Sequence, residues 1–323
     1  MTLADVAALA GVSKATASRA MNQPQLVAPA TRRRVEEAAA TLGFSVNRAA
    51  RALAKGSTGL VSIVVPTLEN TFFTPIIQGA QRAAEAGDLH ATVAVLPGET
   101  EAERERLMRL ADQVDGFVLA SPRSSGTFLR SLAERKPLVT VDRQIEGLPS
   151  VIADTPKALS GLVSGLVAAG HTRIAYVGGP EGSWMDGRRF RAIEAAAGDS
   201  CDVVVLGPVP PVFRSGVALA RELAATRATA VIVYASAIAL GLLFALEREG
   251  VAVPGDLTVA SADDLAVGLL EGLGVTALHV DADRVGETAM STLLAMLSTG
   301  SAPAPLHQRV AVPLHWPHAE PAP

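Results

Sequence analysis

Side chains that can hydrogen-bond to nucleic acid are concentrated near the N-terminus. Ser13, Lys14, Thr16, Ser18 and Arg19 fall within one stretch of seven residues. Basic groups neutralise phosphate charge, and hydroxyl and guanidinium groups donate hydrogen bonds to phosphate oxygens and base edges. If one helix presents these side chains together, the chemistry that they suggest is nucleic-acid binding.

Charge is unevenly distributed along the 323 residues of the chain. Residues 1–58 carry eight basic and three acidic side chains, and the remaining residues carry 20 basic and 29 acidic ones. The first segment therefore has a net charge of +5 and the rest −9, for a total of −4. A basic head on an acidic body is typical of a nucleic-acid module joined to another domain. A solvated basic surface gives the same pattern, and Arg32, Arg33 and Arg34 fit either role.

Local signals predict that this polar stretch lies on a helix-turn-helix. Thr2 and Asp5 fit a capping box that starts a first helix, and Gly11 suits the left-handed turn that ends it. Ser13 then caps a second helix over residues 14 to about 21. Two short helices joined by a tight turn form a helix-turn-helix, whose second helix enters the major groove of DNA.

Further elements complete the N-terminal region. Pro29 and Gly43 bound a third helix. Residues 47–54 favour a helix of only two turns, which is marginal in water on its own, and a flexible linker follows it. We therefore expect a helix-turn-helix headpiece at residues 1–46 and a hinge helix with its linker at residues 47–59.

The N-terminal motifs closely resemble the headpiece of the LacI/GalR family of bacterial transcription regulators. The resemblance covers most of the first 55 residues. The matching stretches are Thr2-Leu-Ala-Asp-Val-Ala7, Ala10-Gly-Val-Ser13, Thr16-Ala-Ser-Arg19, Asn22, Thr31-Arg32, and Asn47-Arg48 with Leu53. At Ala17 the family usually has valine, which is a packing difference and leaves the resemblance intact.

This resemblance implies roles for individual residues toward a double-stranded DNA operator. Lys14, Ala15 and Arg19 would read base edges in the major groove. Leu53, on the hinge helix, would insert into the minor groove, as apolar side chains that unstack and bend DNA do. A core position is the alternative for Leu53, which so short and polar a segment disfavours. Contacts to phosphate or to the DNA backbone are implied for Ser13, Thr16, Ser18, Asn22, Thr31 and Asn47, and Arg48 completes the predicted DNA-binding set.

Residues 60–323 alternate predicted strands and amphipathic helices. The predicted strands are residues 60–65, 91–96, 116–120, 138–141, 173–177, 202–206, 230–234 and 257–261. Their regular alternation with helices indicates parallel βαβ units, which right-handed crossovers assemble into doubly wound lobes. We expect one lobe from about residues 60–155 with 281–300, and a second from about 156–276. The expected fold class is an all-α helix-turn-helix headpiece followed by an α/β core of two doubly wound lobes, residues 60–323.

One stretch, residues 228–246, contains no charged side chain and approaches the length of a membrane span. It divides, however, into a β-branched run, Ala230-Val-Ile-Val-Tyr234, and a segment in which Ser236 can cap a helix running to Glu249. A buried strand and a buried helix are therefore predicted instead. Because the N-terminal residues do not form a signal peptide, the expected location is the cytoplasm, with no membrane partner.

No group of residues in the sequence matches a catalytic or metal-binding motif. The phosphate-loop, dinucleotide-binding and nucleophile-elbow patterns are absent, and the single cysteine, Cys201, excludes a disulfide framework. His315 and His318 are close in sequence, but their proline-rich surroundings disfavour a metal site. No catalytic residue, metal ligand or cofactor is assigned. An α/β enzyme that carries a DNA-binding head, and a sugar receptor, are the alternatives from other classes.

The core resembles the effector-binding core of the same family, which is similar to periplasmic sugar-binding proteins. The matching stretches are Asn70-Thr-Phe-Phe73, Val141-Asp-Arg143, Ala169-Gly-His-Thr-Arg-Ile-Ala175, Gly178-Gly-Pro180 with Arg189, and Val253-Pro-Gly-Asp-Leu-Thr-Val259. The resemblance implies that Phe72 or Phe73 stacks on an effector ring and that Arg189 and Asp263 bind its polar groups. An aromatic face with charge-assisted hydrogen bonds is a physically sensible way to hold a polyol.

Three more residues are candidates for the effector pocket. Asp142 follows a predicted strand, and Ser236 stands where the family commonly has an aspartate. Trp184, in the loop after Pro180, either adds a second stacking wall or only packs that loop.

The sequence departs from the family around this pocket. The usual Asn-Asp is Ala235-Ser236, the usual Gly-Phe/Tyr-Asp-Asp is Ser261-Ala-Asp-Asp264, and Pro211 replaces a common aromatic. The missing carboxylate and aromatics predict an effector that is smaller, less hydroxylated or phosphorylated, or a pocket that has lost its response. A regulator that responds to a non-sugar ligand or to a partner protein is therefore a further alternative.

The function that the sequence predicts is transcriptional regulation, most simply repression. A homodimer formed through the effector cores would bind a palindromic operator, because helix-turn-helix units usually read two half-sites. A small-molecule effector, a sugar or a sugar derivative, would modulate that binding in either direction. The proline-rich residues 303–323 carry no heptad repeat, so no tetramerising helix is expected.

Overall fold

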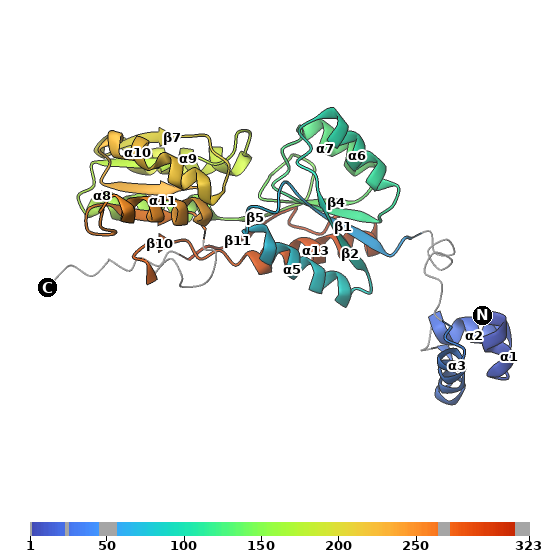
Figure 1. The fold of residues 1–323 in the computed structure, drawn as a ribbon. Helices are drawn as coiled ribbons and strands as arrows, with labels where there is room; N and C mark the ends of the chain where they lie inside the picture. The colour runs from blue at the N-terminus through green and yellow to red at the C-terminus, as the bar shows by residue number, and fades with distance from the viewer. Residues whose placement is uncertain (1, 23–25, 45–56, 264–271, 314–323) are drawn as a thin grey trace. The chain divides into compact units, whose positions relative to one another are not determined.

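The computed structural model describes residues 2–22, 26–44, 57–263 and 272–313. The chain divides into two compact units, residues 1–59 and residues 60–323 (Figure 1). Three residues that the sequence assigns to DNA binding, Asn47, Arg48 and Leu53, lie outside the described residues, as do His315 and His318.

The first unit is a three-helix headpiece. Its helices are α1 (Leu3–Leu9), α2 (Lys14–Asn22) and α3 (Pro29–Thr41). The predicted capping box is present: Thr2 N donates to Asp5 Oδ2 (2.7 Å), and Asp5 N donates to Thr2 Oγ1 (3.4 Å). Gly11 has a φ of +63°, and Ser13 Oγ accepts a hydrogen bond from Thr16 N (3.1 Å) at the start of α2. The predicted helix-turn-helix is therefore confirmed.

Small apolar side chains hold the three helices of the headpiece together. The buried core consists of Val6, Ala7, Ala10, Ala17, Ala20, Val35, Ala38 and Ala39. Since α2 turns two alanines inward, its opposite face is left for polar side chains. Ala17, where the resembled family has valine, is one of the two and is fully buried, so this departure changes packing and not the surface.

The second unit contains two parallel sheets, the first ordered β11-β5-β4-β3-β1-β2. Its strands are β1 (Leu60–Val65), β2 (His90–Val95), β3 (Gly116–Ala120), β4 (Leu138–Val141), β5 (Ser150–Ala153) and β11 (His307–Val310). Its covering helices are α5 (Phe73–Ala86) and α13 (Ala282–Thr299) on one face, and α6 (Glu101–Ala111) and α7 (Gly126–Arg135) on the other. The central strands are rich in valine because helices bury both of their faces.

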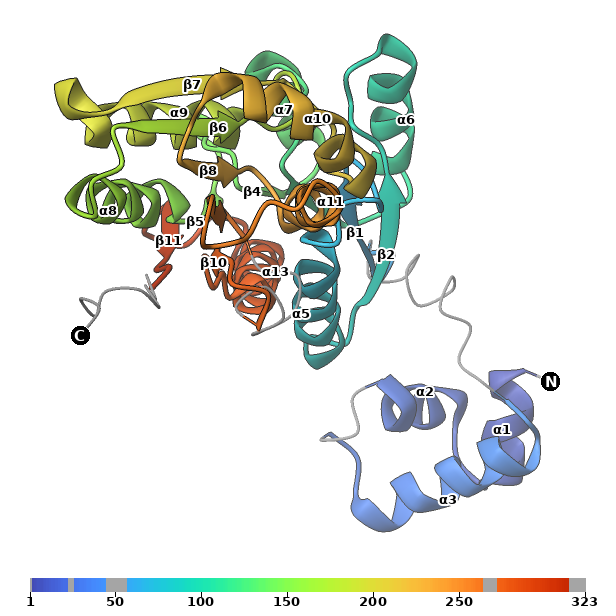
Figure 2. The same ribbon diagram turned by 60° about the vertical axis from the view of Figure 1, so that its left-hand side comes forward.

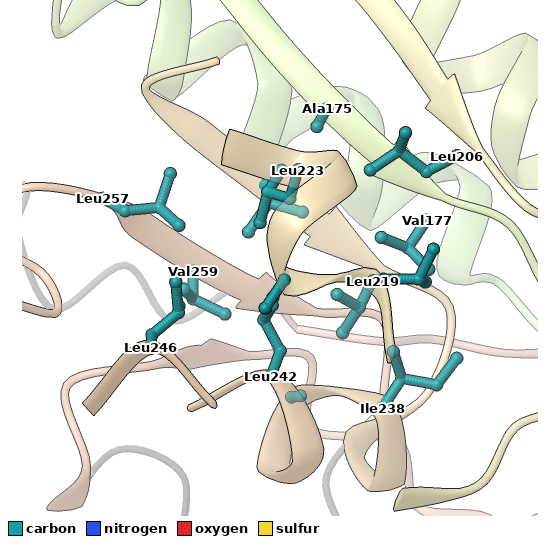
Figure 3. Close-up of a cluster of buried hydrophobic side chains, with 14 of the residues drawn as sticks. Ala175, Val177, Leu206, Leu219, Leu223, Ile238, Leu242, Leu246, Leu257 and Val259 are labelled. Atoms are coloured by element: carbon teal, nitrogen blue, oxygen red, sulfur yellow. The ribbon is translucent and has the colours of Figure 1, made fainter. Parts of the chain in front are cut away.

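The second sheet has the order β10-β9-β8-β6-β7. Its strands are β6 (Arg173–Val177), β7 (Asp202–Leu206), β8 (Ala230–Val233), β9 (Thr258–Ser261) and β10 (Thr276–Ala277). Helices α8 (Thr155–Ala168) and α9 (Trp184–Ala197) pack on one face, and α10 (Phe213–Thr226) and α11 (Ser236–Arg248) on the other. Figure 3 shows the core beneath α10 and α11, where Leu223 and Leu242 meet strand residues such as Val259.

The predicted fold class, a helix-turn-helix headpiece with two doubly wound lobes, is confirmed. The eight predicted strands all form, with bounds that differ by at most one residue. Strands β5, β10 and β11, of four, two and four residues, were not predicted. Strand β11 lies within the proline-rich tail and pairs with β5.

Two pairs of helices pack backbone against backbone. A Cβ atom on Gly79 of α5 would overlap the carbonyl of Asp283, and one on Gly286 of α13 would overlap that of Ile76. Glycines on α10 and α11 make the same close approach to each other's helix. Figure 1 shows α13 beside α5, and the turned view in Figure 2 shows the same pair. Helix α13, near the C-terminus, therefore belongs to the layer that covers the first sheet.

The uncharged stretch at residues 228–246 forms β8 and most of α11, as predicted. Among the described residues, no helix is long and apolar enough to cross a bilayer. The predicted cap at Ser236 is wrong in detail: Ala235 is the cap residue, and the helix begins at Ser236 and ends at Arg248. The N–H of Ser236 instead donates to Asp263 Oδ1 (2.7 Å), since the neighbouring strand end supplies a carboxylate at this helix terminus.

Candidate functional site

The second helix of the headpiece presents its predicted base-reading residues to solvent. Lys14, Ala15 and Arg19 are exposed, whereas Ala17 and Ala20 on the opposite side are buried. An exposed α-helix of this kind fits the major groove, where arginine and lysine donate to guanine and small side chains approach thymine methyl groups. The first two turns of α2 thus form a surface suited to reading base pairs.

The hydroxyl groups that the sequence assigns to phosphate contacts lie on or beside α2 and α3. Ser13 caps α2, and its Oγ lies 2.9 Å from Thr16 Oγ1, so these two hydroxyls sit together at the helix N-terminus. A helix N-terminus favours anions because of its free N–H groups. Ser18 and Thr31 are half-buried, and Asn22 is the last residue of α2.

The arginine run on α3 is exposed along its whole length. Arg32 forms an ion pair with Glu36 one turn later (3.4 Å), which supports a solvating role for that residue. Arg33 and Arg34 remain available for phosphate or for solvent, as the sequence suggests.

A cleft lies at the carboxyl ends of the strands of both sheets. The strand order reverses between β1 and β3 in the first sheet and between β6 and β8 in the second. Open α/β sheets bind ligands at such reversal points. The cleft holds about 440 Å³ of empty space, part of it open to solvent.

Three of the seven predicted effector residues line this cleft: Phe73, Asp142 and Trp184. Phe73 begins α5 and is 4% exposed, and Phe72 packs edge-on against it with ring centres 5.9 Å apart. Asn70 Oδ1 accepts a hydrogen bond from Phe72 N (3.2 Å), which fixes the turn before α5.

Asp142 occupies the first position after β4. It is 3% exposed, has a φ of +52°, and its Oδ1 accepts a hydrogen bond from Ala153 N (3.0 Å). Burial raises the pKa of this carboxyl from 3.8 to about 6, although the Ala153 hydrogen bond and the charge of Arg189 act in the opposite direction. The carboxyl group can therefore change its charge near neutral pH.

Arg189 lies behind the wall of the cleft and is 3% exposed. Its Nε donates to Thr155 Oγ1 (2.9 Å), and its Nη1 donates to the carbonyl oxygen of Tyr234 (3.0 Å). The guanidinium also lies 4.9 Å from the centre of the Tyr234 ring, a cation–π distance. Arg189 is thus engaged within the protein and supports a residue that lines the cleft.

Asp263 and Ser236 are also engaged within the protein. Both are 3% exposed, and the carboxylate of Asp263 accepts the first N–H of α11. The structure thus brings two predicted effector residues together as a helix cap, at the carboxyl ends of β8 and β9.

The sequence predicts that Trp184 lies in a loop, but this residue is the first of α9. Ser183 caps this helix, because its Oγ accepts a hydrogen bond from Asp186 N (3.2 Å). Arg188 stacks on the indole ring at 5.4 Å. The indole nevertheless lines the cleft, so the predicted stacking wall has a place in the structure.

Sequence reasoning missed Tyr234, Arg123 and Arg143, which all line the cleft. Tyr234 is 9% exposed, its hydroxyl lies 3.2 Å from Ser183 Oγ, and burial raises the pKa of its phenol. All three residues stand within three positions of the carboxyl end of a strand that the sequence predicted. This position in a parallel sheet is the signal that could have found them.

Metal ligands do not gather anywhere in the part of the chain that the structure describes: no group of three or more His, Cys, Asp or Glu side chains could hold an ion. His171 Nδ1 contacts Thr229 Oγ1 (2.8 Å), and His307 Nδ1 contacts Ser150 Oγ (2.9 Å). These two histidines have structural partners.

Comparison with protein families assigns both units. Residues 2–47 match the domain described as "Bacterial regulatory proteins, lacI family", and residues 163–316 match the "Periplasmic binding protein-like domain". The chain is 31% identical over 328 residues to the HTH-type transcriptional regulator MalR of Streptomyces coelicolor. This alignment covers 96% of the chain and 94% of MalR.

Two solved structures share the architecture over nearly the whole chain. A complex of the transcriptional regulator CelR with cellobiose is 27% identical, with a TM-score of 0.70 and 98% of each chain covered. The lac repressor dimer bound to operator and the anti-inducer ONPF is 25% identical, with a TM-score of 0.82 and 97% of each chain covered.

Proposed function

This chain belongs to the LacI family of bacterial regulatory proteins, and on that basis we propose that it is a repressor that binds a palindromic operator as a homodimer. A small molecule held in the cleft modulates this binding.

The exposed face of α2 is the observation that most strongly supports DNA recognition by the headpiece. Lys14, Ala15 and Arg19 face solvent on a short helix whose other side is packed into the headpiece. Lys14 and Arg19 supply donors for guanine, and the hydroxyls at the N-terminus of α2 supply phosphate contacts. The net charge of +5 on residues 1–58 adds an attraction to DNA that does not depend on base sequence.

A homodimer is supported by exposed apolar side chains on the second unit. Val93 and Val95 are 40% and 46% exposed on β2, the edge strand of the first sheet. Phe213 and Phe244, on α10 and α11, are 47% and 45% exposed, and their rings pair at 5.8 Å. Exposed aromatic and β-branched side chains at an edge strand and on a helix pair favour burial against a second copy.

An effector is supported by the cleft and by the relatives. The CelR structure is a complex with cellobiose, so a protein of this architecture holds a carbohydrate. The cleft of this chain offers aromatic walls from Phe73, Trp184 and Tyr234 beside charged groups. A carbohydrate derivative is the effector class proposed for this chain, and a regulator that acts on chromosomal DNA works in the cytoplasm.

The core follows the headpiece through residues 47–59, the predicted hinge helix and linker. A change in the relative position of the two lobes would therefore alter how two headpieces meet an operator. A ligand shifts this equilibrium only if its affinities for the two lobe arrangements differ. The contacts that can differ lie on both sides of the cleft: Asp142 and Phe73 from the first lobe, Trp184 and Tyr234 from the second.

The experiment that tests the proposal compares binding of the purified full chain to a palindromic duplex, selected from random sequence, and to a scrambled duplex. We expect strong preference for the palindrome, and a loss of about 1–3 kcal/mol of this preference in Arg19→Ala. Arg135→Ala, on the exposed surface of α7, is the matched control and should keep it. Equal binding of the wild type to both duplexes would overturn the proposal.

A further inference from the structure

Two arginine side chains, Arg123 and Arg143, line the first-lobe side of the cleft. Arg123 stands three positions after β3, and Arg143 stands two positions after β4. Strands β3 and β4 are adjacent and parallel, with Ala120 opposite Val141. The two arginines therefore leave the same edge of the sheet side by side, and both line the cleft.

Only some of the N–H donors of Arg143 have acceptors within the protein. Its Nη1 donates to the carbonyl oxygen of Pro122 (2.8 Å), while its Nε is buried and has no hydrogen-bond partner among the described residues. Arg143 is half-buried, and this burial lowers the pKa of its guanidinium. A buried N–H without an acceptor costs about 1–3 kcal/mol, so an acceptor brought by a ligand would stabilise this side chain.

Arg123 is held in place beside it. Its Nη1 forms an ion pair with Glu99 Oε1 (2.5 Å), and its side chain is only 22% exposed. A guanidinium has five N–H donors in a fixed fork, so a single carboxylate leaves donors available to a ligand. Glu99 does not line the cleft, so it fixes Arg123 from outside the ligand space.

The other charged groups leave an excess of positive charge at the cleft. Asp142 is the single acidic residue among those that line it, and burial raises the pKa of its carboxyl to about 6. Arg189, behind Tyr234, adds a third guanidinium close to this carboxyl. Glu99 pairs with Arg123, and Asp142 lies close enough to Arg189 to share a charge interaction. The guanidinium of Arg143 has no ion-pair partner among the described residues, so its charge is the one that an anionic ligand would balance.

The opposite side of the cleft suits the rest of such a ligand. Trp184 and Tyr234 supply ring faces, and Pro180 and Pro211 supply apolar surface. The two side chains of the second lobe that the sequence assigned to polyol binding, Arg189 and Asp263, do not line the cleft. The polar contacts for a ligand therefore come mainly from the first lobe.

We propose that the effector is a small organic oxyanion, a carboxylate or phosphate monoester on a ring-sized body, whose anionic group is bound by Arg123 and Arg143. This rests on the proposed function, because it requires that the cleft is the effector site. Paired guanidiniums bind carboxylate and phosphate oxygens through charge-assisted, often bidentate hydrogen bonds.

The test uses three probes that share one ring and differ only at C6: glucose, glucuronate and glucose 6-phosphate. Their affinities for the full chain are measured by calorimetry at two salt concentrations. We expect one of the two anions to bind about tenfold or more tightly than glucose, with an affinity that falls as salt rises. Which anion binds more tightly distinguishes a carboxylate effector from a phosphate one.

Variants locate the contact. Arg143→Met should weaken binding of the preferred anion about tenfold or more and leave that of glucose nearly unchanged. Arg123→Met provides a second, independent variant on the adjacent strand, and Arg135→Met on the surface of α7 is the control that should bind as wild type does. Thermal unfolding of each variant shows whether it is folded.

Two outcomes overturn the inference: neither anion binds more tightly than glucose, or the arginine variants weaken glucose and anion equally. Operator binding is measured on the same samples, so the two proposals fail separately. Sequence-specific operator binding with no anion preference overturns the oxyanion effector alone. Loss of sequence-specific operator binding by the wild type overturns the proposed function.

Discussion

Arg189 supports Tyr234 from behind: its guanidinium lies 4.9 Å from the ring centre, and its Nη1 donates to the Tyr234 carbonyl oxygen at 3.0 Å. The same guanidinium donates through Nε to Thr155, the first residue of α8. The arginine that the family resemblance assigned to effector binding thus positions an aromatic wall of the cleft. Tyr234, and not Arg189, lines the cleft.

Gly179 is expected to tolerate a larger side chain only when the Tyr234 ring is removed. A Cβ atom at Gly179 would lie 2.5 Å from a ring carbon of Tyr234, so Gly179→Ala must displace the ring. We expect a destabilisation of about 1–3 kcal/mol, measured by urea unfolding. In a Tyr234→Ala background the same substitution should cost much less, and equal costs in both backgrounds would contradict this contact.

Removal of the Arg189 side chain should affect both stability and effector response. Arg189→Ala leaves the buried carbonyl of Tyr234 without a donor, so we expect the free energy of unfolding to fall by about 1–3 kcal/mol. The effector response should be lost because the Tyr234 wall is no longer held. Operator binding without effector should persist, because the headpiece is a separate unit. Loss of operator binding in a folded variant would argue against this role.

Asp142 should make stability depend on pH in a direction opposite to that of most aspartates. The folded protein keeps the proton up to about pH 6, whereas an ordinary aspartate has lost it above 3.8. Between these values the folded state binds more protons, so stability falls as pH rises from about 4 to 6 and stays low above that range.

Asp142→Asn should remove this term. The stability of the variant relative to the wild type should increase by up to about 3 kcal/mol between pH 4 and pH 7, measured by urea unfolding at each pH. Comparison of the two proteins at each pH cancels the titration of other groups. A difference that does not change with pH would show that the Asp142 carboxyl titrates at its usual pKa in the folded protein.

Leu53→Ala should separate specific from non-specific DNA binding. Leu53 lies outside the described residues, and its role as a minor-groove wedge is a prediction from the family resemblance. We expect weaker binding to the selected palindrome and unchanged binding to random DNA at low salt, measured by fluorescence anisotropy. An equal loss for both duplexes would contradict the wedge.

The headpiece and the layer order of the core were predictable because their signals are local. The capping box at Thr2, the turn at Gly11 and the valine-rich runs that form β1 and β8 each specify an element without distant contacts. Strand β11 could not be predicted, because its four residues acquire their partner only when β5 is already in place.

The cleft was predictable only in outline. Sequence placed Phe73, Asp142 and Trp184 near a ligand, and all three line the cleft. It did not show that Tyr234 would cover Arg189, since the two are 45 residues apart and meet through side-chain packing. The sequence also did not show that Asp263 would cap α11. The cap residue, Ala235, has no side chain that could accept a hydrogen bond, and this becomes evident only when the start of the helix is known.

Genome-wide in vitro selection of the DNA fragments that the purified full chain binds tests whether the headpiece recognises a specific DNA sequence. The selection is run with and without neutral sugars, sugar acids and sugar phosphates. We expect enrichment of one palindromic motif with a flexible central step, and a change in its recovery when an anionic member of the panel is present. Absence of any enriched motif would contradict the assignment of the headpiece to sequence-specific DNA binding.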